Sequence, residues 1–230
     1  MFGQEVAPSD YDLRFRCFGF PVRVSPWFWV VSAALWWSER LEYTLVGVAA
    51  VFVSILLHEL GHAFAIRYYG GHSEIVLHHL GGYATCRVNP SRLGNIVISA
   101  AGPAAGLSLW GLLTLALHLR PEILLNTKPL AQWFVVALLW VNGYWSLVNL
   151  LPIWPLDGGQ ISHQVFGRFR AFDAWELTLK LSILVCSAIV VWLVFQFVQK
   201  GDGDKFLILF FGLLAFQNIQ TLQMSTRGRW

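Results

Sequence analysis

Long apolar segments are the feature that most limits what this chain can fold into. Only 13% of its 230 residues are charged, about half the share found in an average soluble domain. Most of the segments reach the roughly 20 residues that a helix needs to cross about 30 Å of hydrocarbon. They cover residues 26–38, 43–69, 94–118, 130–151, 177–198 and 205–222. The sequence therefore predicts an all-α membrane protein of about six transmembrane helices, of which the first is short.

The Lys and Arg residues between these segments predict the orientation. Six crossings place both termini on one side, and eleven of the 16 basic residues, Arg87 and Arg229 among them, fall on that side. The positive-inside rule then places the termini in the cytoplasm. The basic residues are dispersed and the net charge is only +3, so the lipid bilayer is an expected partner and nucleic acid is not.

A polar motif interrupts the second apolar segment. His58-Glu59-Leu60-Gly61-His62 matches the pattern HExxH. Helical spacing places His58 and His62 one turn apart on the same face, where two imidazoles can share a Zn²⁺ ion and Glu59 can act as the general base. Ionisable residues inside a transmembrane segment are costly and usually mark function. The alternative is a pair of histidines that only form interhelical hydrogen bonds.

A catalytic zinc site needs a third protein ligand, and Asp157 is the candidate. It follows residues 130–151 within the stretch NLLPIWPLDGG. Taken alone, an aspartate here would more often stabilise a turn. However, segments 43–69 and 130–151 run in the same direction, and both motifs lie toward their cytoplasmic ends. His58, His62 and Asp157 can therefore share one depth and hold one Zn²⁺ per chain.

The stretch between the second and third segments, residues 70–93, does not read as a simple loop. Short extended runs flank Gly81-Gly82, which is typical of a hairpin. At membrane depth such a backbone must be buried in protein or line a water-filled cavity. We expect a small membrane-embedded β-hairpin or sheet beside the HExxH helix. A hairpin lying on the cytoplasmic surface is the alternative.

The two polar motifs together resemble those of the site-2 protease family of intramembrane zinc metalloproteases. The stretches PVRVSPWFW and ISAAGPAAG also resemble that family, so the similarity covers residues 18–165. It implies regulated cleavage of peptide bonds in or near transmembrane segments of membrane-protein substrates. The residues implied are the ligands His58, His62 and Asp157, the base Glu59, and the substrate-binding residues Asn149, Gly81 and Gly82.

The resemblance also implies a domain organisation and a location. We expect one membrane-embedded domain over residues 1–230, with a core at 18–165 and two additional spans at 177–198 and 205–222. This corresponds to the compact bacterial type without PDZ or CBS domains. We expect it in the bacterial inner membrane, with the active site toward the cytoplasm.

Three other functions compete with proteolysis of this type. A divalent-metal transporter would carry ionisable residues along several spans, whereas here they gather at one depth. A catalytically inactive membrane scaffold would be expected to have lost Glu59. A prenyl-protein type of HExxH protease would take a late glutamate as its third ligand, for which Glu176 is the candidate, but the Leu-Asp-Gly stretch fits better.

Overall fold

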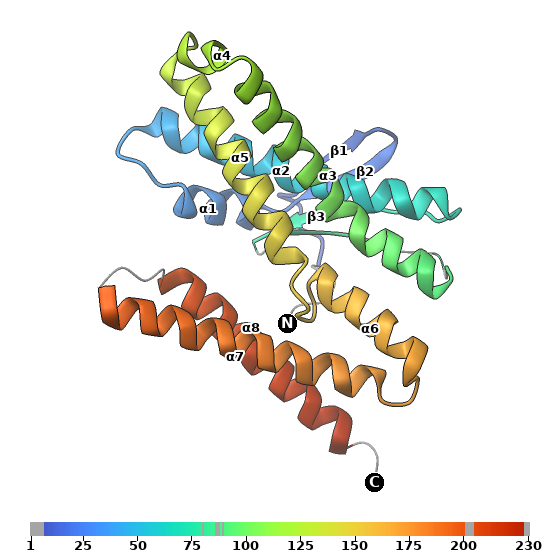
Figure 1. Ribbon diagram of the computed structural model, residues 1–230. Helices are drawn as coiled ribbons and strands as arrows, with labels where there is room; N and C mark the ends of the chain where they lie inside the picture. The colour runs from blue at the N-terminus through green and yellow to red at the C-terminus, as the bar shows by residue number, and fades with distance from the viewer. Residues whose placement is uncertain (1–6, 80, 86–87, 89, 201–204, 228–230) are drawn as a thin grey trace. The chain divides into compact units, whose positions relative to one another are not determined.

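The computed structural model describes residues 7–79, 81–85, 88, 90–200 and 205–227 (Figure 1). Arg87 and Arg229, which count toward the predicted charge bias, lie outside these residues. The chain forms two compact units, Glu5–Val148 and Asn149–Trp230. The first contains β1 (Leu13–Cys17), β2 (Phe20–Val24), α1 (Pro26–Leu35), α2 (Leu41–Tyr68), β3 (Ile75–His78), β4 (Gly81–Ala84), α3 (Arg92–Leu119), α4 (Glu122–Leu125) and most of α5 (Pro129–Asn149). The second contains α6 (Asp157–Phe169), α7 (Ala174–Lys200) and α8 (Lys205–Arg227).

Five of these helices, namely α2, α3, α5, α7 and α8, are long and apolar enough to cross a membrane. The predicted multi-pass, mainly helical membrane protein is therefore confirmed. The first predicted span forms only α1, a helix of 10 residues that is about 15 Å long. Because that length is half of the hydrocarbon thickness, α1 alone does not provide a sixth crossing.

The expected small sheet is present and has four strands in the order β1-β2-β3-β4. β1 and β2 form an antiparallel hairpin, β2 and β3 are parallel, and β3 and β4 form the second antiparallel hairpin. Side chains of β2 and β3 pack against α1 and α2 in a shared core. The fully buried side chains of this core include Val24, Ile75, Leu77 and Ala63. The sheet is thereby held against the helix that carries the HExxH motif.

The helices of the first unit approach one another closely at glycines. α2 and α3 lie side by side (Figure 1), and a Cβ atom on Gly61 of α2 would overlap the carbonyl of Ala101 on α3. A Cβ atom on Gly106 of α3 would overlap the hydroxyl of Ser146 on α5. Small residues at helix contacts are the usual way to bring backbones together in lipid.

In the second unit, α7 and α8 pack against each other along their lengths. A short turn joins α6 to α7, and the two helices also contact each other. The segment between α5 and α6, residues 150–156, precedes Asp157 directly. Its conformation therefore decides where that carboxylate is held.

Candidate metal centre

His58 and His62 face each other on α2, as the spacing predicted. Their Nε2 atoms are 3.2 Å apart, and the side chains are buried, with 3% and 8% of their surface exposed. Two nitrogens that bind one zinc ion at 2.0–2.1 Å in tetrahedral geometry are about 3.3 Å apart. The pair thus has the spacing that a shared zinc ion requires.

The imidazole of His62 is oriented by α3. Its Nδ1–H donates a hydrogen bond of 2.7 Å to the carbonyl oxygen of Ile98. This bond places the proton on Nδ1, so Nε2 carries the lone pair that would bind a metal. Histidines that bind a metal are commonly oriented by such a second hydrogen bond. The ring lies so close to α3 that a Cβ atom on Gly102 would overlap it. Gly102 therefore makes room for His62 as well as for helix packing.

Glu59 is buried beneath the second hairpin, with 3% of its surface exposed. A Cβ atom on Gly82 of β4 would lie 2.7 Å from the Glu59 Cγ and 2.9 Å from its Oε1. The backbone of β4 therefore packs directly on this carboxylate. Gly81 has a positive φ of +121°, and a Cβ atom there would lie 2.8 Å from the Trp145 ring on α5. Close contacts therefore leave no room for a larger side chain at either glycine.

Asp157 and Asn149 belong to the second unit. Asp157 is the first residue of α6, and Asn149 is the last residue of α5; each has 7% of its surface exposed. Gly158 and Gly159 leave no room for a side chain, because a Cβ atom on either would overlap backbone atoms of the preceding loop. The loop therefore folds tightly against the start of α6.

One set of described residues has the composition of a metal site: the buried side chains of His58, His62 and Asp157. Other histidines lack a comparable setting within the described residues. His78 ends β3, where burial, together with His79 and Arg23, lowers the pKa of its imidazole to about 4, so it is neutral at pH 7. His163 on α6 packs against the ring of Trp175.

Two contacts at this site were not predicted from the sequence. The carbonyl of Ile98 cannot be recognised from a side-chain pattern, because it is a backbone atom. Trp145 supports Gly81 through a contact between α5 and β4, and nothing in the sequence links these two positions. The sequence signal for such contacts was the set of glycines on the apolar segments, Gly61, Gly102 and Gly106, since a glycine on a transmembrane helix predicts a close neighbour.

Comparisons with known proteins identify relatives of this chain. Residues 124–193 match the model of peptidase family M50. A zinc metalloprotease of Methanocaldococcus jannaschii is 30% identical over 69% of this chain and 47% of its own length. The stage IV sporulation protein FB of Bacillus subtilis is 27% identical over 76% of this chain and 58% of its own length. The chain thus spans about half the length of these curated relatives.

A solved structure has the same fold. The site-2 protease from Methanocaldococcus jannaschii superposes with a TM-score of 0.59, covering 92% of this chain and 95% of that one, at 24% sequence identity. The fold is therefore a known one.

Proposed function

We propose that this chain is a zinc metallopeptidase that cleaves membrane-protein substrates in or near their transmembrane segments. The chain belongs to the site-2 protease family (peptidase family M50). The observation that carries the proposal is the buried pair of His58 and His62, whose Nε2 atoms lie 3.2 Å apart on a membrane-spanning helix beside Glu59. Two transmembrane imidazoles at metal-binding distance, next to a buried carboxylate, fit hydrolysis better than transport or a purely structural role.

Asp157 is the third ligand in this proposal. Zinc at a catalytic site takes three protein ligands and keeps one position open, and two imidazoles with one carboxylate form a known ligand set of that kind. The residue types support the assignment, since two histidines and an aspartate, all buried, are side chains that bind zinc. Asp157 is buried at the start of α6.

The chemistry divides between the metal and the chain. A zinc ion held here would polarise the peptide carbonyl and acidify water. Glu59 takes the proton from the attacking water and then donates it to the leaving amine. Its burial beneath β4 excludes bulk water from the carboxylate.

The substrate must be extended when it is cut, because a helical peptide bond keeps its carbonyl in the hydrogen-bond ladder. β4 is the last strand of the four-stranded sheet, so one of its edges can pair with an extended peptide. Gly82 places no side chain between this strand and Glu59, and Gly81 makes room for the Trp145 ring. We assign substrate binding to these glycines and to Asn149.

The location follows from charge. With α1 as a short sixth crossing through a locally thinned bilayer, about two thirds of the Lys and Arg residues lie on the side that carries the termini, which supports termini in the cytoplasm. His58, His62 and Asp157 then lie in the cytoplasmic half of a bacterial inner membrane. The whole chain works as one membrane-embedded domain in this proposal.

The ligand assignment is tested by Asp157→Ala. Loss of a direct ligand should weaken zinc binding by roughly 10²-fold or more, since even removal of an outer-shell partner costs 10–100-fold. Zinc per purified chain should fall well below one, and cleavage of single-span substrates in liposomes should stop. Asp10→Ala is the matched control, because Asp10 is an exposed carboxylate. Full zinc content in Asp157→Ala would remove this residue from the ligand set.

A further inference from the structure

The turn between β1 and β2 holds an aromatic residue in a backbone conformation that such residues rarely adopt. Cys17 pairs with Phe20, so the turn consists of Phe18 and Gly19, whose φ angles are +50° and +86°. Two-residue hairpin turns with two positive φ angles strongly prefer Asn-Gly. A phenylalanine at positive φ is an outlier, and such positions often serve a function.

The ring of Phe18 does not fill the core. It is 70% exposed, and its centroid lies 5.8 Å from that of Phe64 on α2. Phe64 is itself 41% exposed, and Tyr68, one turn further along α2, is 84% exposed. The turn thus extends an aromatic surface that begins on a membrane-spanning helix.

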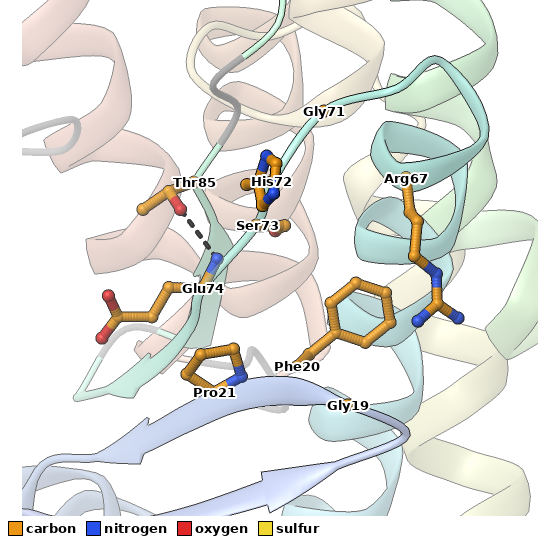
Figure 2. A pocket seen from close by; sticks show the side chains of 9 residues that line it. All are labelled: Gly19, Phe20, Pro21, Arg67, Gly71, His72, Ser73, Glu74 and Thr85. Carbon is orange, nitrogen blue, oxygen red and sulfur yellow. Dashed lines mark hydrogen bonds between the residues drawn. The ribbon is translucent and has the colours of Figure 1, made fainter.

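Arg67 fastens the turn to the end of α2. Its Nη1 donates a hydrogen bond of 3.1 Å to the carbonyl oxygen of Phe18, and its guanidinium lies 4.3 Å from the Phe20 ring centroid and 4.8 Å from that of Phe64. Figure 2 shows this side chain reaching from α2 toward Gly19, beside the ring of Phe20. The turn therefore lies at the same depth as the last turn of α2.

The length of α2 bears on the depth of this turn in a membrane. α2 has 28 residues and is about 42 Å long, whereas the hydrocarbon core is about 30 Å thick. Its last turn therefore reaches the headgroup region, where aromatic rings and basic side chains gather.

We propose that Phe18, Phe64 and Tyr68 form an interfacial anchor, which inserts into the lipid leaflet at the end of α2. Exposed Arg67, and Arg16 next to the turn, supply positive charge at the level of the lipid phosphates. Because the sheet is continuous from β1 to β4, the anchor holds β4 at a constant depth in the bilayer.

Fluorescence in lipid vesicles tests the anchor without relying on activity. The probe is the fluorophore NBD, attached to Phe18→Cys in a full chain whose Cys17 and Cys86 are serine; Cys186 is buried and does not react. Vesicles of phosphatidylcholine and phosphatidylglycerol carry 5-doxyl lipid. We expect the doxyl lipid to quench the probe and iodide in the buffer not to reach it. The control is Tyr11→Cys, which lies near the open end of the hairpin, is 86% exposed and should show the reverse.

Equal iodide quenching at both positions would overturn the anchor. Phe18→Asn distinguishes a role of the ring in membrane anchoring from a role in folding, since asparagine suits the turn better than phenylalanine. Its melting temperature in detergent should equal or exceed that of the wild type. A clear loss of stability would mean that the Phe18 ring is a structural contact.

A second inference comes from the other unit. The backbone N–H of Trp154 donates to the hydroxyl oxygen of Ser182 on α7 at 2.8 Å. The Nδ2 of Asn218 on α8 donates to the Trp154 carbonyl at 2.7 Å. Both polar side chains are almost fully buried within membrane-spanning helices. They satisfy both backbone groups of one residue, three positions before Asp157.

We propose that Ser182 and Asn218 are positioning residues for Asp157, which rests on the proposed ligand role of that carboxylate. Burying a polar side chain in an apolar helix is costly. Nevertheless α7 and α8 each bury one polar side chain, and both side chains bond to the backbone of Trp154. Only two residues separate Trp154 from Asp157, which is the first residue of α6. The last two spans thereby fix the position of the third ligand.

The test measures zinc affinity by competition with a chelator, together with kcat and KM. Ser182→Ala and Asn218→Leu should each weaken zinc binding about 10-fold and lower kcat more than KM, whereas Ser182→Thr, which keeps the hydroxyl, should restore both. The controls are Ser187→Ala, which changes an exposed serine of α7, and Thr221→Val, because Thr221 bonds only within α8.

The outcomes separate this proposal from the one on which it rests. Unchanged zinc affinity in Ser182→Ala and Asn218→Leu, alongside zinc loss in Asp157→Ala, would overturn the positioning role alone. Unchanged zinc binding in Asp157→Ala would instead overturn the ligand assignment. If Asn218→Leu does not fold, the pair Ser182→Ala and Ser182→Thr still decides the matter.

Discussion

Glu59→Gln should abolish peptide cleavage while leaving zinc bound. Glutamine has nearly the same shape as glutamate, so it fits beneath Gly82. The space there is tight, since a Cβ atom built on Gly82 would lie only 2.7 Å from the Glu59 Cγ. It cannot accept the proton of the attacking water. Loss of a general base costs about 10²–10⁴-fold in rate. The measurement is kcat/KM against single-span substrates in liposomes, with zinc content determined on the same sample.

The matched control for this variant is Glu42→Gln. Glu42 lies on the same helix, in its first turn, and is exposed. It should retain activity, zinc and melting temperature. Cleavage at the wild-type rate by Glu59→Gln would show that another group moves the proton. Zinc loss in that variant would show that Glu59 also supports the metal.

Gly102→Ala should lower zinc affinity and cleavage rate, although Gly102 lies on α3 and not on the helix that carries the histidines. A Cβ atom at Gly102 would overlap the His62 ring, so the imidazole must move away from α3. The hydrogen bond from its Nδ1 to the Ile98 carbonyl would then break, and Nε2 would no longer face His58. Overpacking of this kind costs about 1–3 kcal/mol, and loss of the orienting bond weakens metal binding roughly 10–100-fold. Zinc affinity and cleavage rate should both fall.

Gly111→Ala on the same helix is the control. A Cβ atom at Gly111 would meet nothing within 4 Å, and alanine favours a helix over glycine by about 1 kcal/mol. This variant should keep full activity and be as stable as the wild type or slightly more stable. Equal activity in the two variants would contradict the proposed fit between His62 and α3.

The helical spans could be predicted because hydropathy is a local property. A run of about 20 apolar residues can cross lipid only as a helix whose backbone groups are satisfied internally. The same rule explains why the first predicted span forms only a short helix, since α1 has 10 residues and not about 20. A hairpin within residues 70–93 was also predictable from its own residues, but the predicted place of the glycines was wrong. Gly81 and Gly82 were expected between the two extended runs, and they lie in β4, paired with His78 and Leu77. The pairing of that hairpin with β2 was not predictable, because Val22 and Ile75 are far apart in the sequence.

The proximity of the two histidines was predictable for a similar reason. The helical repeat alone places His58 and His62 on one face, and the structure has their Nε2 atoms at 3.2 Å. The ligand roles of His58, His62 and Asp157 stay predictions, as does the role of Glu59 as the base. The substrate-binding roles of Asn149, Gly81 and Gly82 also stay predictions. A ligand from another helix depends on how the helices pack, and no local repeat encodes that.

By itself, the sequence determined the class of protein and the chemistry available to it: a membrane-spanning helix with two imidazoles one turn apart and a carboxylate beside them. Only the tertiary structure decided how these groups are oriented and enclosed. The Ile98 carbonyl sets the tautomer of His62, and Gly82 brings β4 onto Glu59. The physical reason is range, since hydropathy and helical spacing act within a few turns, whereas these contacts join residues that only folding brings together.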